Sequence, residues 1–216
     1  RKFIKTVMEL GGSAPGIIFE DADLDLAIGN VCVNRLANQG QCCDGLKRLI
    51  VHESIFNEVV EKVVSAFSAK KIGNAEEKDT QVGPLVAKRQ LELLVSQVQD
   101  AKSKRTTIVA GGNSLEEKLG GAFFEPTVLI GVTSDMRVWK EEVFGPVLPI
   151  VKFKTEEEAI ELANQTSYGL GAYVYTQNKE KADRVSAFLE SGMVSVNGVN
   201  YVMPFNPFGG YKNSGF

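Results

Sequence analysis

The chain has 216 residues, of which 44% are hydrophobic and 24% charged, a balance typical of a soluble globular protein long enough to bury a core. Its net charge of −3 comes from intermixed acidic and basic residues without a basic stripe, which argues against a nucleic-acid partner. No apolar run reaches the roughly 18 residues that a membrane-spanning helix needs, so we expect no membrane partner.

Strand-like and helix-like segments alternate along the whole chain, a pattern typical of crossover units around a mainly parallel sheet. We therefore predict the α/β class. After an extended lead at 4–10, the predicted strands cover residues 16–19, 48–51, 107–109, 123–129, 147–153, 171–175 and 194–197. The predicted helices begin after residues 23 and 54, include 91–98, and cover 155–162 and 179–189.

Local signals predict how several of these elements begin. Asp23 and Ser54 are candidate N-caps for the first two helices, because their side-chain oxygens can accept from free backbone N–H groups. Thr155 followed by Glu158 forms a capping box. Pro126 has no N–H to donate, so we expect its strand at a sheet edge or in irregular pairing.

The chain contains three cysteines and a single histidine. Cys32, Cys42 and Cys43 are an odd number in a chain too large to need disulfides, which fits a reducing compartment, and we expect a cytoplasmic protein. Because His52 is the only histidine, we expect no metal site.

Cys43 is the candidate nucleophile. It follows the polar, glycine-bearing run 38–41 in a loop that precedes a predicted strand, and the cations Lys47 and Arg48 come close behind. The alternative is a small core residue, since free cysteines are often buried. A vicinal disulfide with Cys42 would need strained geometry, although a redox role stays open.

Two carboxylates are further candidates for the site. Glu9 precedes a Gly-Gly turn, where partial burial would raise its pKa toward the range of a general base; a solvated surface residue is the alternative. In the segment 141–146, a carboxylate could bind a ribose and an aromatic ring could pack on a planar cofactor. An ordinary entry to a strand explains that segment equally well.

Taken together, seven motifs occur in the order found in NAD(P)-dependent aldehyde dehydrogenases, which the chain resembles over nearly its whole length. Each motif alone is weak, but their order makes coincidence implausible. They are MELGG at 8–12, NQGQCC at 38–43, the segment 79–85, FEPTV at 124–128, EEVFGPV at 141–147, YGL at 168–170 and PFGGYKNSG at 207–215.

The resemblance implies a three-layer fold, with a mostly parallel twisted sheet and helices on both faces. It also implies that Cys43 attacks an aldehyde, that the thiohemiacetal passes its hydride to NAD or NADP, and that Glu9 activates the water that releases the acid. The backbone N–H of Cys43 would be one oxyanion donor. Glu142 would hold the nicotinamide ribose, Phe144 would flank the cofactor and Leu10 would approach the nicotinamide.

The resemblance also implies a division of the chain. Residues 1–11 would end a preceding domain or form a hinge, and residues 12–216 would form the catalytic domain. The chain starts without Met and stops after a glycine-rich stretch, so we expect a piece of a longer protein that lacks a cofactor-binding domain and an oligomerisation arm. We expect the intact protein to be a homo-oligomer, and the isolated chain to be inactive as a dehydrogenase.

One position departs from the family pattern. Asp44 follows the nucleophile where the family usually has a small or apolar residue, and its charge should oppose thiolate formation and repel an anionic substrate. The run 43–48 nevertheless looks most similar to the succinate-semialdehyde branch. Two alternatives stay open: a cysteine hydrolase that uses Cys43 with His52, and a non-catalytic structural or interaction domain.

Overall fold

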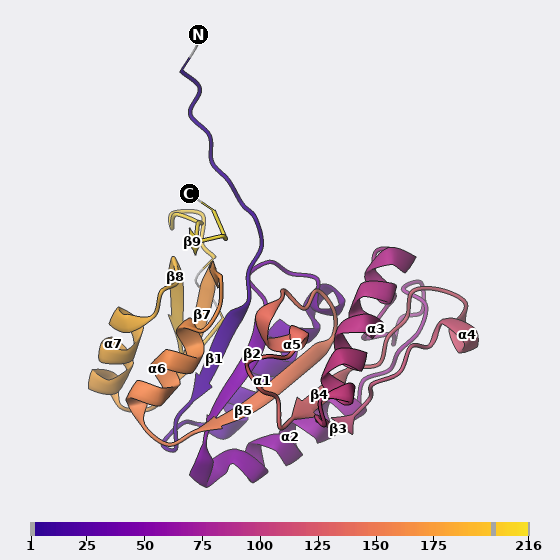
Figure 1. Ribbon diagram of the computed structural model, residues 1–216, viewed down its shortest axis with the longest axis horizontal. Coiled ribbons are helices and arrows are strands. Elements are labelled where there is room, and N and C mark those ends of the chain that lie inside the picture. The colour runs from indigo at the N-terminus through magenta and orange to yellow at the C-terminus, as the bar shows by residue number, and fades with distance from the viewer. Residues whose placement is uncertain (1–2, 200–201, 216) are drawn as a thin grey trace.

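A parallel sheet forms the centre of the molecule. In the computed structural model, residues 3–199 and 202–215 are described, and seven strands within these ranges pair in the order β3-β4-β5-β2-β1-β7-β8 (Figure 1). All neighbours are parallel except β3, which runs antiparallel to β4. The strands are β1 (Ala14–Ile18), β2 (Leu46–His52), β3 (Thr107–Ala110), β4 (Thr127–Ile130), β5 (Val147–Phe153), β7 (Gly171–Tyr175) and β8 (Met193–Val196).

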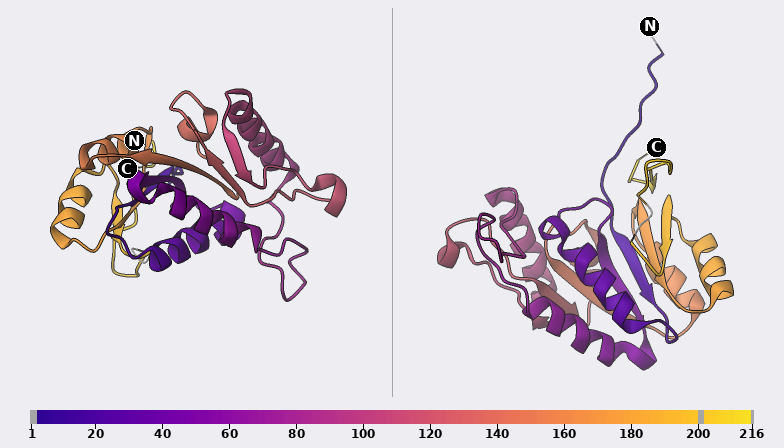
Figure 2. Two further views of the ribbon diagram at one scale, coloured as in Figure 1. Left: turned by 90° about the horizontal axis from the view of Figure 1, so that it is seen from below. Right: turned by 180° about the vertical axis from the view of Figure 1, so that it is seen from behind.

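Helices cover both faces of this sheet, so the expected three-layer α/β fold is confirmed (Figure 2). Buried residues of α1 and α2 belong to one core cluster, and those of α3, α5, α6 and α7 to the other. The helices are α1 (Leu24–Leu36), α2 (Phe56–Ser68), α3 (Lys88–Ser103), α4 (Glu116–Leu119), α5 (Arg137–Lys140), α6 (Glu156–Asn164) and α7 (Lys179–Phe188), with short 3-10 helices η1 (Ala37–Gly40) and η2 (Glu53–Ile55).

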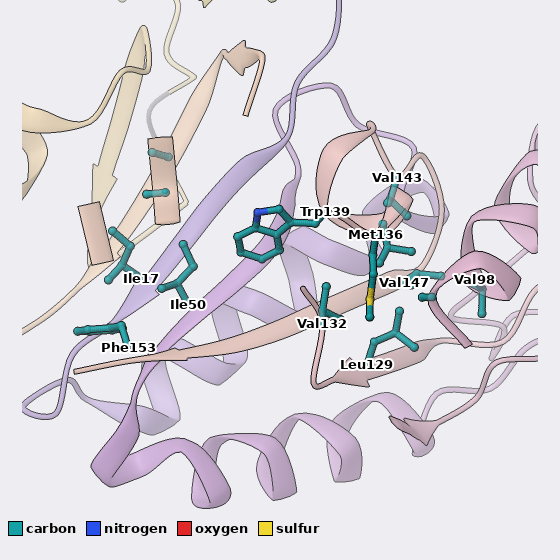
Figure 3. Close-up of a cluster of buried hydrophobic side chains, with 14 of the residues drawn as sticks. Ile17, Ile50, Val98, Leu129, Val132, Met136, Trp139, Val143, Val147 and Phe153 are labelled. Atoms are coloured by element: carbon teal, nitrogen blue, oxygen red, sulfur yellow. The ribbon is translucent and has the colours of Figure 1, made fainter. Parts of the chain in front are cut away.

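Successive side chains of each central strand point alternately into the two cores. Ile17 of β1 pairs with Ile50 of β2 and both face the α3, α6 side, whereas the next pair, Ile18 and Val51, faces α1 and α2. Figure 3 shows part of the first core, where Trp139 lies among aliphatic side chains from the sheet. This alternation follows from the period of two in a strand, and it fixes the register because a slip by one residue would exchange the faces.

The starts of three helices test the N-cap predictions. Asp23 accepts from the backbone N–H of Leu26 and Thr155 from that of Glu158, so both N-caps are confirmed. The capping box is not complete, because the carboxylate of Glu158 accepts from the N–H of Lys154 instead of Thr155. The Ser54 prediction is wrong, because α2 begins later and the Ser54 hydroxyl bonds the His52 ring instead.

Of the two expectations for the strand near Pro126, the sheet-edge position is wrong, whereas irregular pairing is confirmed, because the register between β3 and β4 shifts between Ile108 and Ala110. β4 starts one residue after the proline and lies between β3 and β5, so no ladder bond is needed from Pro126.

The segment 3–10 leaves the body of the molecule as an extended lead (Figure 1). It is anchored where the backbone N–H of Leu10 donates to the carbonyl of Ser214, next to a bridge between Glu9 and Gly215. Nearby, β6 (Tyr168–Gly169) and β9 (Tyr211–Lys212) form a small antiparallel pair. Within the described ranges, no helix combines the length and apolar character needed to cross a membrane.

Candidate active site

The candidate residues gather at the amino end of the sheet. Gly11 and Gly12 precede β1, the cysteine pair precedes β2, and the segment 141–145 precedes β5. Because β5, β2 and β1 are adjacent and parallel, the loops before them share one edge of the sheet. Open α/β sheets usually bind ligands at the carboxyl ends of their strands, so this placement is a feature of the particular fold.

Two glycines allow the loops to touch. A side chain at Gly12 would place its Cβ 2.5 Å from the carbonyl oxygen of Cys43, so only glycine leaves room for that approach. Gly11 has a φ of +109°, and a Cβ there would lie 2.6 Å from Oε2 of Glu142. The Gly-Gly turn after Glu9 therefore contacts both the loop that carries Cys43 and the carboxylate of Glu142.

A buried ammonium lies beneath these loops. Lys47 has no exposed side-chain surface, and its Nζ donates to the carbonyls of Cys42 at 2.6 Å and Cys43 at 2.8 Å. It also lies 3.2 Å from Oε1 of Glu142, which accepts from the backbone N–H of Gly12 at 3.1 Å. Burial lowers the pKa of Lys47 to about 8, and the charge on Glu142 opposes that shift.

The thiol of Cys43 is half-buried and not strongly activated in this chain. Burial raises its pKa most, and the charge on Asp44 raises it further, in the direction expected from the sequence. A hydrogen bond from the backbone N–H of Asp44 and the charge of Lys47 lower the pKa, while the charge on Glu9 raises it. The carboxylate of Glu9 is therefore within electrostatic reach of the sulfur.

Glu9 and Leu10 lie on the exposed lead. The partial burial expected for Glu9 is not found, because the segment 4–10 forms no strand and Glu9 is exposed. Glu9 lines a cavity of about 240 Å³ together with residues 207–211. Leu10 is 51% exposed and directly precedes the glycine that contacts Glu142.

Glu142 and Phe144 line a second cavity, of about 350 Å³, together with Tyr168. Glu141 lines the same cavity but is held by Arg137 through two bonds of 2.7 and 2.9 Å, whereas Glu142 is the carboxylate bonded to Lys47 and Gly12. A carboxylate and aromatic rings on one cavity fit the ribose and the planar ring of a nucleotide.

Arg48 and His52 take no part in this arrangement. Arg48 donates to the carbonyls of residues 13, 162 and 163 and lies 4.9 Å from the Trp139 ring, on the other side of β2 from Lys47. His52 ends β2 and its Nδ1 bonds Ser54 at 2.8 Å. A seven-residue strand spans about 20 Å, so the structure does not bring His52 to Cys43.

Sequence reasoning missed Arg35. This side chain is fully buried in α1 and donates to carbonyls of Leu46, Gly40, Val143 and Gly145. It therefore joins the loop before β2 to the loop before β5. The sequence held one signal for this role: Arg35 comes four residues after the buried Val31 and so lies on the apolar face of α1. A cation on a buried face must find oxygen partners.

The cysteines are all free thiols. Burial raises the pKa of Cys42, followed by the charge on Asp44, and the Cys42 thiol lies 3.7 Å from the carbonyl of Ala37. Within the described part of the chain, no group of three or more His, Cys, Asp or Glu residues is placed to hold a metal ion.

Comparison with known proteins places the chain in one family. The sequence model of the aldehyde dehydrogenase family matches residues 1–216. The chain is 43% identical to mitochondrial aldehyde dehydrogenase 2 of Saccharomyces cerevisiae over 98% of its own length and 41% of that protein. It is 42% identical to the succinate-semialdehyde dehydrogenase [NADP(+)] of Deinococcus radiodurans, over 100% of its own length and 45% of that protein.

The fold agrees with this match. An NAD+ complex of aldehyde dehydrogenase from Bacillus cereus superposes with a TM-score of 0.93 at 42% identity, covering 97% of this chain and 42% of that one. The chain thus spans about two fifths of the length of the relatives it matches. Sequence, fold and the order of the motifs agree that the chain belongs to the aldehyde dehydrogenase family.

Proposed function

We propose that this chain carries the nucleophile and the general base of an NAD(P)-dependent enzyme that oxidises an aldehyde to a carboxylic acid. The observation that carries the proposal is the contact between the turn after Glu9 and the carbonyl of Cys43, made possible by Gly12. That contact supports a shared site for the thiol of Cys43 and the carboxylate of Glu9, which come from distant parts of the sequence. Membership of the aldehyde dehydrogenase family supports the same chemistry.

The proposed reaction divides into two halves. The thiol of Cys43 loses its proton to solvent, its Sγ attacks the aldehyde carbon, and the backbone N–H of Cys43 donates to the oxygen that becomes negative. Held by Glu142 and Phe144, NAD(P)+ would supply the hydride acceptor that this carbon needs, and Cys43 would then carry the acyl group as a thioester. Glu9 then takes a proton from a water molecule, the resulting hydroxide attacks the thioester, and the carboxylic acid leaves as the thiol re-forms.

Other residues of the chain would hold the cofactor. Glu142 and Phe144 line a cavity whose chemistry suits the nicotinamide ribose and ring, and Leu10 lies next to the turn beside Glu142. The exposed apolar residues Phe3 and Ile4 suit packing against another domain. We propose that residues 1–11 belong to a hinge and 12–216 to the catalytic domain, and that a cofactor-binding domain outside this chain completes a homo-oligomeric enzyme.

The proposed substrate class is a small aliphatic aldehyde, with succinate semialdehyde as one member. The Deinococcus radiodurans relative supports this member, whereas the charge of Asp44 beside the thiol opposes an anionic substrate. In a longer protein that contains this chain, kcat/KM for succinate semialdehyde should be compared with that for uncharged butanal. A value for butanal more than tenfold higher would remove succinate semialdehyde from the proposal.

The test of the nucleophile needs no cofactor. An activated ester such as p-nitrophenyl acetate should acylate Cys43 of the purified chain and release a burst of nitrophenol equal to the sites present. Cys43→Ser should abolish the burst, and Cys42→Ser, its matched control, should retain it. A full burst in Cys43→Ser, with acetyl found on another residue by peptide mapping, would overturn the proposal.

A further inference from the structure

Lys47 is a charged residue that the proposed reaction does not use. It neither contacts the thiol as a base nor reaches the surface, since its side chain has 0% exposure. Burying an ammonium is costly unless all its protons find partners. Here the three N–H donors have three oxygen partners: the carbonyls of Cys42 and Cys43 and the carboxylate of Glu142.

The two carbonyls belong to the peptide units on either side of Cys43. The carbonyl of Cys42 shares its peptide plane with the N–H of Cys43, which is the proposed oxyanion donor. The carbonyl of Cys43 shares its plane with the N–H of Asp44, which donates to the thiol and lowers its pKa. The ammonium bonds both carbonyls, and the carbonyl of Cys42 also accepts from the backbone N–H of Gly45 at 3.2 Å. Together these bonds set the direction of both N–H groups that can stabilise negative charge at this site.

A hydrogen bond accepted by the carbonyl also makes the N–H of the same peptide a stronger hydrogen-bond donor. A hydrogen bond to an amide oxygen polarises the amide, and a charged donor does so more than a neutral one. The ammonium of Lys47 adds a direct charge effect, because it lowers the pKa of Cys43. Both effects act against the burial and the Asp44 charge that disfavour the thiolate.

The third bond of Lys47 connects this loop to Glu142. The carboxylate lies 3.2 Å from Nζ and also accepts from Gly12, so three loops before three parallel strands meet at one ion pair. Any buried ammonium needs an acceptor for each of its three protons, and here two of the acceptors are the carbonyls on either side of the nucleophile. The two additional bonds to consecutive carbonyls around the nucleophile indicate a more specific role.

We propose that Lys47 is a positioning residue, whose ammonium orients and polarises the two peptide units around Cys43 and ties them to Glu142. The role in stabilising an oxyanion rests on the proposed function; the role toward the thiolate does not. Lys47 thereby acts through backbone groups. Arg48, the next cation along the chain, cannot take this role because its side chain lies on the other side of the sheet.

The test measures alkylation of Cys43 by iodoacetamide as a function of pH, read by peptide mapping with Cys32 as the internal reference. Lys47→Met removes the ammonium at similar length, and should shift the midpoint for Cys43 upward by about one pH unit and slow labelling at neutral pH about tenfold. Lys47→Gln keeps two donors without charge and should recover part of the rate. Lys62→Met, at an exposed lysine, should change nothing.

A merely structural role predicts a different result. If Lys47 only supports the loop, its loss would expose Cys43, so labelling would become faster with an unchanged midpoint, and that result would overturn the proposal. Should neither Lys47 variant fold, Glu142→Gln serves instead. Loss of its partner charge should let Lys47 lose its proton at lower pH, which again slows labelling of Cys43, and an unchanged profile would contradict the link.

Acylation by the activated ester separates this inference from the proposed function. In Lys47→Met we expect the acylation rate constant to fall at least tenfold at saturating ester, with a smaller change in the half-saturating concentration. A shifted alkylation profile in a chain that forms no acyl-enzyme at all would reject the proposed function and leave the thiolate role of Lys47 intact. Normal acylation in Lys47→Met would reject the oxyanion role alone.

Discussion

The two ends of the parallel sheet hold their charges differently. At the amino end, Lys47 and Arg35 are fully buried and each is surrounded by oxygen atoms from several loops. At the carboxyl ends of β2 and β5, Lys154 and Glu53 are 3.8 Å apart, with 68% and 45% of their side chains exposed. Exposed pairs contribute little to stability, whereas a buried charge with several partners determines the geometry around it.

The largest effect should follow from removing a buried cation of the amino end. Arg35→Met leaves carbonyl groups around the loops before β2 and β5 without their donor, and we expect a loss of about 3–5 kcal/mol in the free energy of unfolding. Lys154→Met, at the other end, should change it too little to measure. Urea unfolding of both variants tests the difference, and equal losses would contradict the comparison.

A smaller effect should follow from filling the contact between two loops. Gly12→Ala places a methyl group 2.5 Å from the Cys43 carbonyl, which is backbone and can yield only if the loop moves. We expect a loss of about 1–3 kcal/mol in stability and slower acylation of Cys43.

Gly29→Ala is the matched control for that substitution. Nothing lies within 4 Å of a Cβ at Gly29 in helix α1, and alanine there should stabilise by about 0.5–1 kcal/mol. If Gly12→Ala behaves like Gly29→Ala, the close approach of the two loops is not required for stability.

The smallest effect concerns charge alone. The charge of Asp44 raises the pKa of the Cys43 thiol, so Asp44→Asn should lower that pKa and increase the thiolate fraction below it. We expect alkylation of Cys43 near pH 7 to become about threefold to tenfold faster, and the gain to vanish above the thiol pKa, where both forms are ionised. Equal rates at neutral pH would show that Asp44 does not oppose the thiolate.

The fold was largely predictable because its elements carry strong local patterns. The expected strands at 147–153 and 171–175 agree with β5 and β7, whose apolar residues fill the two cores. Asp23 is a cap within one turn of its helix, and such contacts are local in sequence. Ser54 failed because the His52 ring, at the end of the preceding strand, competes for the same hydroxyl.

The candidate site residues were predictable from the sequence, but the buried cations that hold their loops in place were not. Lys47 and Arg48 are equivalent as neighbouring cations in the sequence, and only the alternation of side chains along β2 sends one toward Cys43 and the other toward Trp139. The bonds of Arg35 to Val143 join residues 108 positions apart, which no local pattern reveals. The exposure of Glu9 likewise depends on which residues pack against the segment 3–10, which no local pattern determines.

The central claim is that Glu9 serves the thiol at position 43, and deacylation tests it most directly. After acylation of Cys43 by the activated ester, Glu9→Gln should leave the burst intact and slow the release of acetate by about 100-fold or more, because the amide cannot accept a proton from water. Glu58→Gln, at an exposed carboxylate on α2, should release acetate at the unmodified rate. Unchanged deacylation in Glu9→Gln would contradict the account.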